Sequence, residues 1–117
     1  LIEGAHNGTG LGFQFLRHIE RTLMLLHLID VSVMSGTDPV ESFEKINNEL
    51  LHYNKDLMNR PQIIVATKID IVDREKLDRL SKYCDDNKIP FFAVSAMTGK
   101  GIKNLVGHIS SEIEGLR

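Results

Sequence analysis

The chain has 117 residues, of which 42% are hydrophobic and 26% are charged, and its formal net charge is −2. This length allows one small domain or a piece of a larger one, and the interspersed charges argue against nucleic-acid binding through bulk charge, although a local basic patch stays open. The single cysteine, Cys84, excludes an internal disulfide and favours a reducing, cytoplasmic compartment.

The first third of the chain predicts a helix, a strand and the start of a second helix. Residues 11–21 place apolar side chains at helical spacing, which predicts a helix of about three turns. Residues 23–31 form a short, nearly continuous apolar run, which is typical of a buried parallel strand and is far shorter than the roughly 18 residues that cross a bilayer. Asp38, followed by Pro39 and by Glu41 three positions on, predicts a helix N-cap with a capping box.

The rest of the chain repeats the alternation of helix and strand. Apolar residues at steps of three and four predict amphipathic helices over residues 43–57, 77–87 and 102–113. The short apolar runs 63–66 and 91–94 predict two further strands. Strands joined by helices form right-handed parallel crossovers, so the sequence predicts an α/β fold with three parallel strands and flanking helices.

Ligands of open parallel sheets bind at the carboxyl ends of the strands. After the first strand come Ser32 and Met34, which indicate no obvious chemistry. The second strand leads into Thr67, Lys68, Ile69 and Asp70, and the third leads into Ser95, Ala96 and Met97. Because these two strands are consecutive, the two motifs are expected to be neighbours in space.

The first motif suits recognition of a guanine base. The carboxylate of Asp70 accepts two hydrogen bonds, and guanine presents two adjacent donors on N1 and N2, which adenine lacks on that edge. Lys68 would lay its aliphatic stem along a face of the base, and the N–H of Ala96 would meet the purine O6. The alternative is that Lys68 and Asp70 are ordinary loop charges, with Asp70 as a helix cap. The Ser95–Ala96 pair after the next strand favours the guanine site.

Other motifs indicate no catalytic or metal-binding residues. The four glycines within residues 4–12 fit neither the dinucleotide fingerprint nor the Walker pattern, so no phosphate cradle is predicted. Cys84 lies on the apolar stripe of its helix, as a core thiol does. The histidines stand at no metal-ligand spacing; they are His6, His18, His27, His52 and His108.

Taken together, these residues resemble the Obg family of bacterial GTPases along the whole chain. Residues 1–21 look like that family's switch II segment and the helix that follows, with the Asp-x-Pro-Gly motif expected just before Leu1. Residues 67–70 match the guanine-specificity motif Asn-Lys-x-Asp, with Thr67 in place of asparagine. Residues 95–97 match the last nucleotide motif.

The resemblance implies that residues 1–117 are the C-terminal half of an Obg-type GTPase domain, with 22–117 as its guanine-recognition half. The fold would be a partial P-loop NTPase (Ras-like) fold that supplies strands 4, 5 and 6. It also implies a parent protein that is cytoplasmic, binds GTP and GDP with Mg²⁺, hydrolyses GTP and associates with the large ribosomal subunit during assembly. Since the phosphate and Mg²⁺ ligands would lie upstream of Leu1, this chain alone is expected to hold no nucleotide tightly and to lack GTPase activity.

Two alternatives stay open: a stand-alone guanine-nucleotide-binding module without hydrolysis, and a nucleotide-independent α/β protein such as a response-regulator-like fold. The latter would want a cluster of aspartates at the first strand end, where Asp30 has no acidic neighbour. The resemblance further implies that strand 23–31 lacks a partner on one side. Since nothing in its sequence blunts that edge, the isolated chain is expected to self-associate through it.

Overall fold

The computed structural model describes residues 17 and 22–116, so the switch II segment and, apart from Arg17, the predicted helix at 11–21 lie outside the described residues. The sheet has the order β1-β2-β3, with β1 at Leu25–Asp30, β2 at Gln62–Thr67 and β3 at Phe91–Ala93. Both pairings are parallel. The three predicted parallel strands are therefore confirmed.

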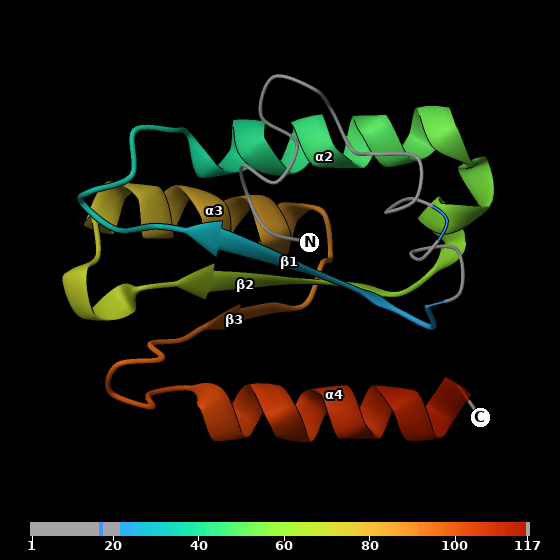
Figure 1. Ribbon diagram of the computed structural model, residues 1–117. Coiled ribbons are helices and arrows are strands. Elements are labelled where there is room, and N and C mark those ends of the chain that lie inside the picture. Colours follow the sequence, from blue (N-terminus) through green and yellow to red (C-terminus); the bar gives the residue numbers. More distant parts are fainter. Residues whose placement is uncertain (1–16, 18–21, 117) are drawn as a thin grey trace.

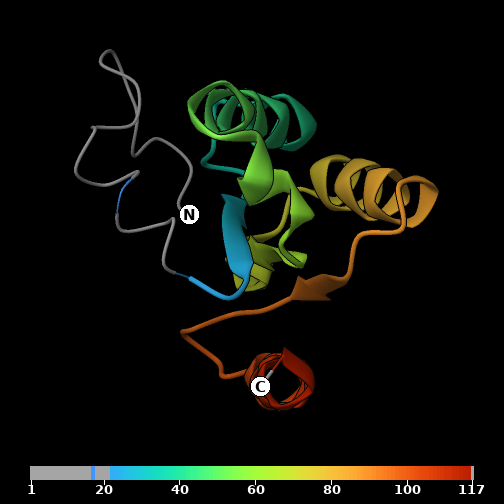
Figure 2. The same cartoon turned by 90° about the vertical axis from the view of Figure 1, so that its right-hand side faces the viewer.

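Helices cover both faces of this sheet (Figure 1). Helices α2 (Pro39–Tyr53) and α3 (Arg74–Asp86) lie on one face, and α4 (Ile102–Leu116) lies on the other. Figure 2 shows the same three layers after a quarter turn. Two short 3₁₀ helices, η1 (Lys55–Asn59) and η2 (Ile69–Ile71), precede and follow β2.

The central strand β2 is buried on both faces. Ile64 and Ala66 pack into the core beneath α2 and α3, whereas Ile63 and Val65 pack with Leu105 of α4. A strand that is covered on both faces has no solvent-facing side chains, so its sequence shows no alternation of apolar and polar residues and is continuously apolar. Among the described residues β1 pairs only with β2, and self-association through its outer edge stays a prediction.

The cap of α2 is confirmed, but the capping box is not. The Asp38 carboxylate accepts a hydrogen bond from the N–H of Val40 at 3.1 Å. It also accepts from Arg79 Nε at 3.0 Å and Nη2 at 2.8 Å. These Arg79 bonds lower the pKa of Asp38 more than burial raises it. Within the described part of the chain, the Glu41 carboxylate makes no return bond to the backbone N–H of Asp38.

Several predicted boundaries differ from the structure. Helix α2 ends at Tyr53, and Leu57 lies in η1, because Asn54 is extended (φ −160°) and its side chain caps η1. Leu57 is fully buried. Its spacing from the apolar residues of α2 therefore correctly indicated a buried side chain, but not that the helix continues to it. The first strand is shorter than residues 23–31, and Val94 lies just beyond β3. Val106 of α4 is 54% exposed, since only the stripe around Leu105 meets the sheet.

His27 lies on β1 and is 1% exposed, with its ring edge-on to Phe43 at a centroid distance of 4.7 Å. Among the described residues neither ring nitrogen has a hydrogen-bond partner. Burial lowers the pKa of His27 to about 4. The folded state therefore favours the neutral imidazole.

We expect the folded chain to lose stability between pH 6.5 and pH 4. The folded pKa of His27 lies below the unfolded value of 6.5, so its contribution is complete above pH 6.5 and is lost as the pH falls. At about 1.4 kcal/mol per pH unit, the free energy of unfolding should be about 2 kcal/mol lower at pH 5 than at pH 7. Urea midpoints at the two pH values measure this.

The variant His27→Leu should remove most of that pH dependence, because no buried imidazole then has to stay neutral. His52→Leu is the matched control, since His52 is exposed on α2. The carboxyl groups of Asp30 and Asp38 titrate below this window, because their pKa values are lowered from 3.8. An unchanged loss in His27→Leu would place the acid-sensitive group elsewhere.

Candidate functional site

The two sequence motifs lie together at the carboxyl edge of the sheet. All three strands end on the same side, and the loops that follow β1, β2 and β3 leave the sheet there (Figure 1, left). The loop after β2 contains η2, which carries Asp70, and the loop after β3 carries Ser95. The N–H of Ile69 donates to the carbonyl of Val94 at 3.3 Å and ties the two loops to each other.

Asp70 and Ser95 form a direct hydrogen bond. The Ser95 hydroxyl donates to Asp70 Oδ1 at 2.8 Å and accepts the N–H of Thr98 at 3.2 Å. Ser95 is fully buried, whereas Asp70 is exposed. The serine therefore lies beneath the carboxylate and orients it, and its hydroxyl does not face solvent. It remains a predicted site residue, but one whose position suits an action through Asp70.

The alternative in which Asp70 caps a helix is wrong. The N-cap of α3 is Asp73, whose carboxylate accepts from the N–H groups of Glu75 at 3.1 Å and Lys76 at 3.4 Å. Asp70 lies inside η2, three residues earlier, and its carboxylate bonds Ser95. Because Asp73 caps α3, Asp70 has no part in that cap, and its side chain stays exposed at the edge of the sheet.

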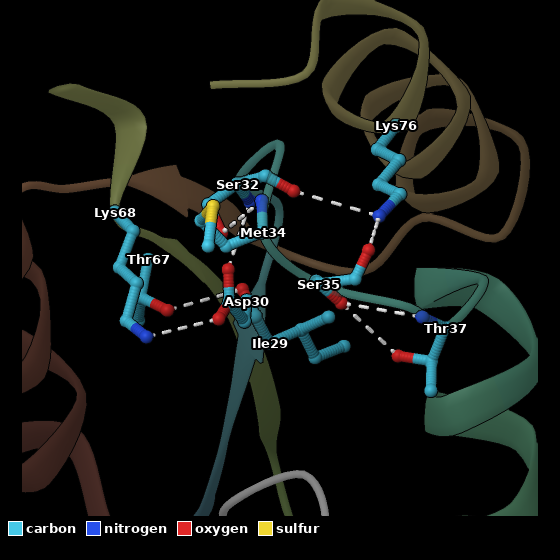
Figure 3. Close-up of polar contacts among 9 residues, drawn as sticks. All are labelled: Ile29, Asp30, Ser32, Met34, Ser35, Thr37, Thr67, Lys68 and Lys76. Atoms are coloured by element: carbon cyan, nitrogen blue, oxygen red, sulfur yellow. Dashed lines mark hydrogen bonds and ion pairs between the residues drawn. The ribbon is translucent and has the colours of Figure 1, made fainter. Parts of the chain in front are cut away.

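Lys68 has an unusual backbone and a specific charged partner. Its φ of 62° and ψ of 39° lie in the left-handed region, which few residues other than glycine adopt. Its Nζ lies 3.0 Å from Asp30 Oδ2, and the lysine side chain is 59% exposed (Figure 3). Left-handed backbone in a non-glycine residue costs about 1–2 kcal/mol and is concentrated at functional sites.

Asp30, at the end of β1, was not among the predicted site residues. Its Oδ1 accepts the N–H of Ser32 at 2.8 Å (Figure 3). Burial raises the pKa of Asp30, but the hydrogen bonds from Ser32 and the ammonium of Lys68 outweigh it, so the pKa is lowered. The carboxylate is therefore ionised at neutral pH. The signal available in the sequence was its place at a strand end, beside the strand that leads into Lys68.

The remaining predicted residues occupy different positions around this edge. Thr67 is half-buried, and its hydroxyl donates to the carbonyl of Ile29 at 3.3 Å (Figure 3). Ala96 and Met97 are exposed, and Met97 is 86% exposed. Asp70, Lys68 and Ala96 are thus all exposed at one edge of the sheet.

The loop after β1 is fastened to the same edge. The N–H of Val33 donates to the carbonyl of Ile71 at 2.9 Å, and Lys76 Nζ bonds the carbonyl oxygens of Ser32 and Ser35 (Figure 3). The first bond holds η2 against the loop after β1, and the Lys76 bonds hold α3 against the same loop. Ser32 therefore has a structural role where the sequence indicated no chemistry.

Within residues 22–116 no three His, Cys, Asp or Glu side chains are grouped so that they could hold a metal ion. The described helices include none that is long and apolar enough to cross a membrane.

Comparison with known proteins decides the family of this chain. Residues 24–115 match the Ras family, and this match includes every strand and helix described above except the last residue of α4. The chain belongs to the Ras family. Its three parallel strands with flanking helices are accordingly part of a Ras-like GTPase domain.

Among individual proteins, the chain is similar to several that are named GTPase Obg. It is 52% identical to the one from Thermodesulfovibrio yellowstonii over 97% of this chain and 34% of that protein. It is 50% identical to the one from Aquifex aeolicus over 100% of this chain and 34% of that protein. It is 47% identical to the one from Alkaliphilus metalliredigens over 99% of this chain and 27% of that protein. The resemblance to the Obg family is confirmed, and the chain spans about a third or less of these relatives' length.

Proposed function

We propose that this chain supplies the guanine-recognition half of the nucleotide site in an Obg-type GTPase. Asp70 would accept the N1 and N2 donors of guanine, Lys68 would lie along one face of the base, and the N–H groups near Ala96 and Met97 would meet O6. Thr67 and Ser95 would support this arrangement from below. The ligand would be GTP or GDP, with Mg²⁺ held by parts of the whole protein outside this chain.

The hydrogen bond between Ser95 and Asp70 is the observation that carries this proposal. It joins the two motifs and fixes one carboxylate oxygen at 2.8 Å, while the side chain of Asp70 stays exposed at the carboxyl edge of the sheet. A carboxylate whose rotamer is already held loses little entropy when it accepts a base. Adenine offers no pair of donors on its corresponding edge, so the same carboxylate discriminates between the two purines.

The whole protein is proposed to hydrolyse GTP, and this chain alone is proposed to be inactive. Phosphoryl transfer depends on donors and Mg²⁺ around the β- and γ-phosphates. The contacts proposed for residues 67–70 and 95–97 are all with the base, so none of them stabilises those phosphates. The resemblance to the Obg family also supports a cytoplasmic protein that assists assembly of the large ribosomal subunit.

Calorimetry on the complete protein tests the proposal. With Mg²⁺ present, GDP should bind at least about tenfold more tightly than ADP, because charge-assisted hydrogen bonds contribute about 1.5–3 kcal/mol each. Asp78→Ala, which changes an exposed carboxylate on α3, should leave both affinities unchanged. Equal affinities for GDP and ADP would contradict a guanine site at this edge.

A further inference from the structure

The ammonium of Lys68 is held at the end of the neighbouring strand. Thr67 pairs with Asp30 in the parallel register of β1 and β2, so the next residue, Lys68, begins its turn beside the Asp30 side chain. Its Nζ lies 3.0 Å from Asp30 Oδ2, and the other carboxylate oxygen is bonded by the N–H of Ser32 (Figure 3). Asp30 therefore bridges the loop after β1 and the lysine of the loop after β2.

Both ends of the Lys68 side chain are consequently restrained. The left-handed backbone determines how the side chain leaves the turn, and the ion pair determines where it finishes. A lysine has four rotatable side-chain bonds and loses much conformational freedom when a ligand orders it. Restraint before binding removes part of that loss, which is how preorganisation strengthens affinity.

We propose that Asp30 is a positioning residue of the base site. Its carboxylate holds the Lys68 ammonium at the end of β1, so that the aliphatic stem of Lys68 lies ready along one face of the base. Asp30 touches no nucleotide in this arrangement and acts only through Lys68. The inference rests on the proposed guanine-nucleotide site and adds a residue that neither motif contains.

A double-mutant cycle on the complete protein tests this role. Asp30→Asn removes the charge, but its amide oxygen still accepts the N–H of Ser32. Lys68→Met keeps an unbranched stem without the ammonium. We expect Asp30→Asn to weaken GDP binding about two- to fivefold, the range set by partly exposed ion pairs. In the Lys68→Met background the same change should have no effect, because the group through which Asp30 acts is gone.

Two further variants separate positioning from a general structural effect. Asp38→Asn is the matched control, since Asp38 pairs with Arg79 at 2.8 Å with similar exposure and lies outside the base site. Asparagine also caps helices well, so α2 is kept. Its GDP affinity should be unchanged. Asp30→Glu, which keeps the charge, should restore part of the affinity that Asp30→Asn loses.

Each outcome bears on the proposal. Equal losses from Asp30→Asn with and without Lys68 would overturn it and show a structural role. No loss in either background, or no recovery in Asp30→Glu, would also overturn it. If GDP and ADP bind the unaltered protein equally, the proposed function itself fails. A preference for GDP without coupling between Asp30 and Lys68 would remove only the positioning role.

Discussion

Replacing Asp70 with asparagine is expected to shift the base preference of the complete protein from guanine toward xanthine. Guanine loses the charged acceptor for its N1 and N2 donors: the amide oxygen still accepts from N1, but the amide NH₂ faces the N2 amino group, which is also a donor. Xanthine has a carbonyl at C2, which accepts from that amide. Loss of one charge-assisted hydrogen bond corresponds to about 10- to 100-fold weaker GDP binding, so the ratio of xanthine to guanine affinity should rise by about 100-fold.

The hydrogen bond to Ser95 determines which way the new amide points. The Ser95 hydroxyl donates to Oδ1 at 2.8 Å and already accepts the N–H of Thr98. In the Asp70→Asn variant the amide oxygen is therefore expected at the Oδ1 position, which turns the NH₂ group toward the base. Adding Ser95→Ala should blunt the xanthine preference, because the amide then loses the donor that orients it.

Calorimetry with GDP and XDP measures both effects. Asp78→Asn is the control, because it makes the same chemical change on an exposed side chain of α3. Unaltered GDP and XDP affinities in Asp70→Asn would remove Asp70 from the base site. A gain for XDP in the Asp78 variant would show that the shift reflects net charge and not recognition.

Replacing Gly101 with alanine is expected to lower the free energy of unfolding strongly. A Cβ at this position would lie 2.2 Å from the carbonyl oxygen of Ala93, a backbone atom at the end of β3 that cannot move aside alone. The φ of +80° adds the cost of left-handed backbone. These two penalties together amount to about 2–4 kcal/mol of unfolding free energy. Urea unfolding followed by circular dichroism measures the difference.

Gly99→Ala separates the two penalties. Gly99 has the same φ of +80°, but a Cβ there would meet nothing within 4 Å. This variant should lose only the backbone part, about 1–2 kcal/mol. Equal losses in the two alanine variants would show that the close approach to Ala93 costs nothing. Because Gly101 ends the loop that carries Ser95, its alanine variant should also bind GDP less tightly.

The sequence by itself determined the alternation of strands and helices and the edge at which the site lies. Apolar spacing reports which side chains are buried, and burial on both faces of β2 leaves a run that no surface strand would have. The cap at Asp38 could also be predicted from the sequence, because a short polar side chain before Pro39 accepts hydrogen bonds from the N–H groups of the first turn. Local hydrogen bonds and periodicity need no knowledge of distant residues.

The tertiary structure alone decided how the site residues are divided between the surface and the interior. Ser95 is buried beneath Asp70, although the two are 25 residues apart in the sequence. Asp30 and Lys68 form an ion pair between the ends of the neighbouring strands β1 and β2. Leu57 shows the same limit, since its helical spacing continued into a 3₁₀ turn. Such contacts follow from strand register and loop path. These depend on the free energy of the whole packed sheet, which no single stretch of the sequence contains.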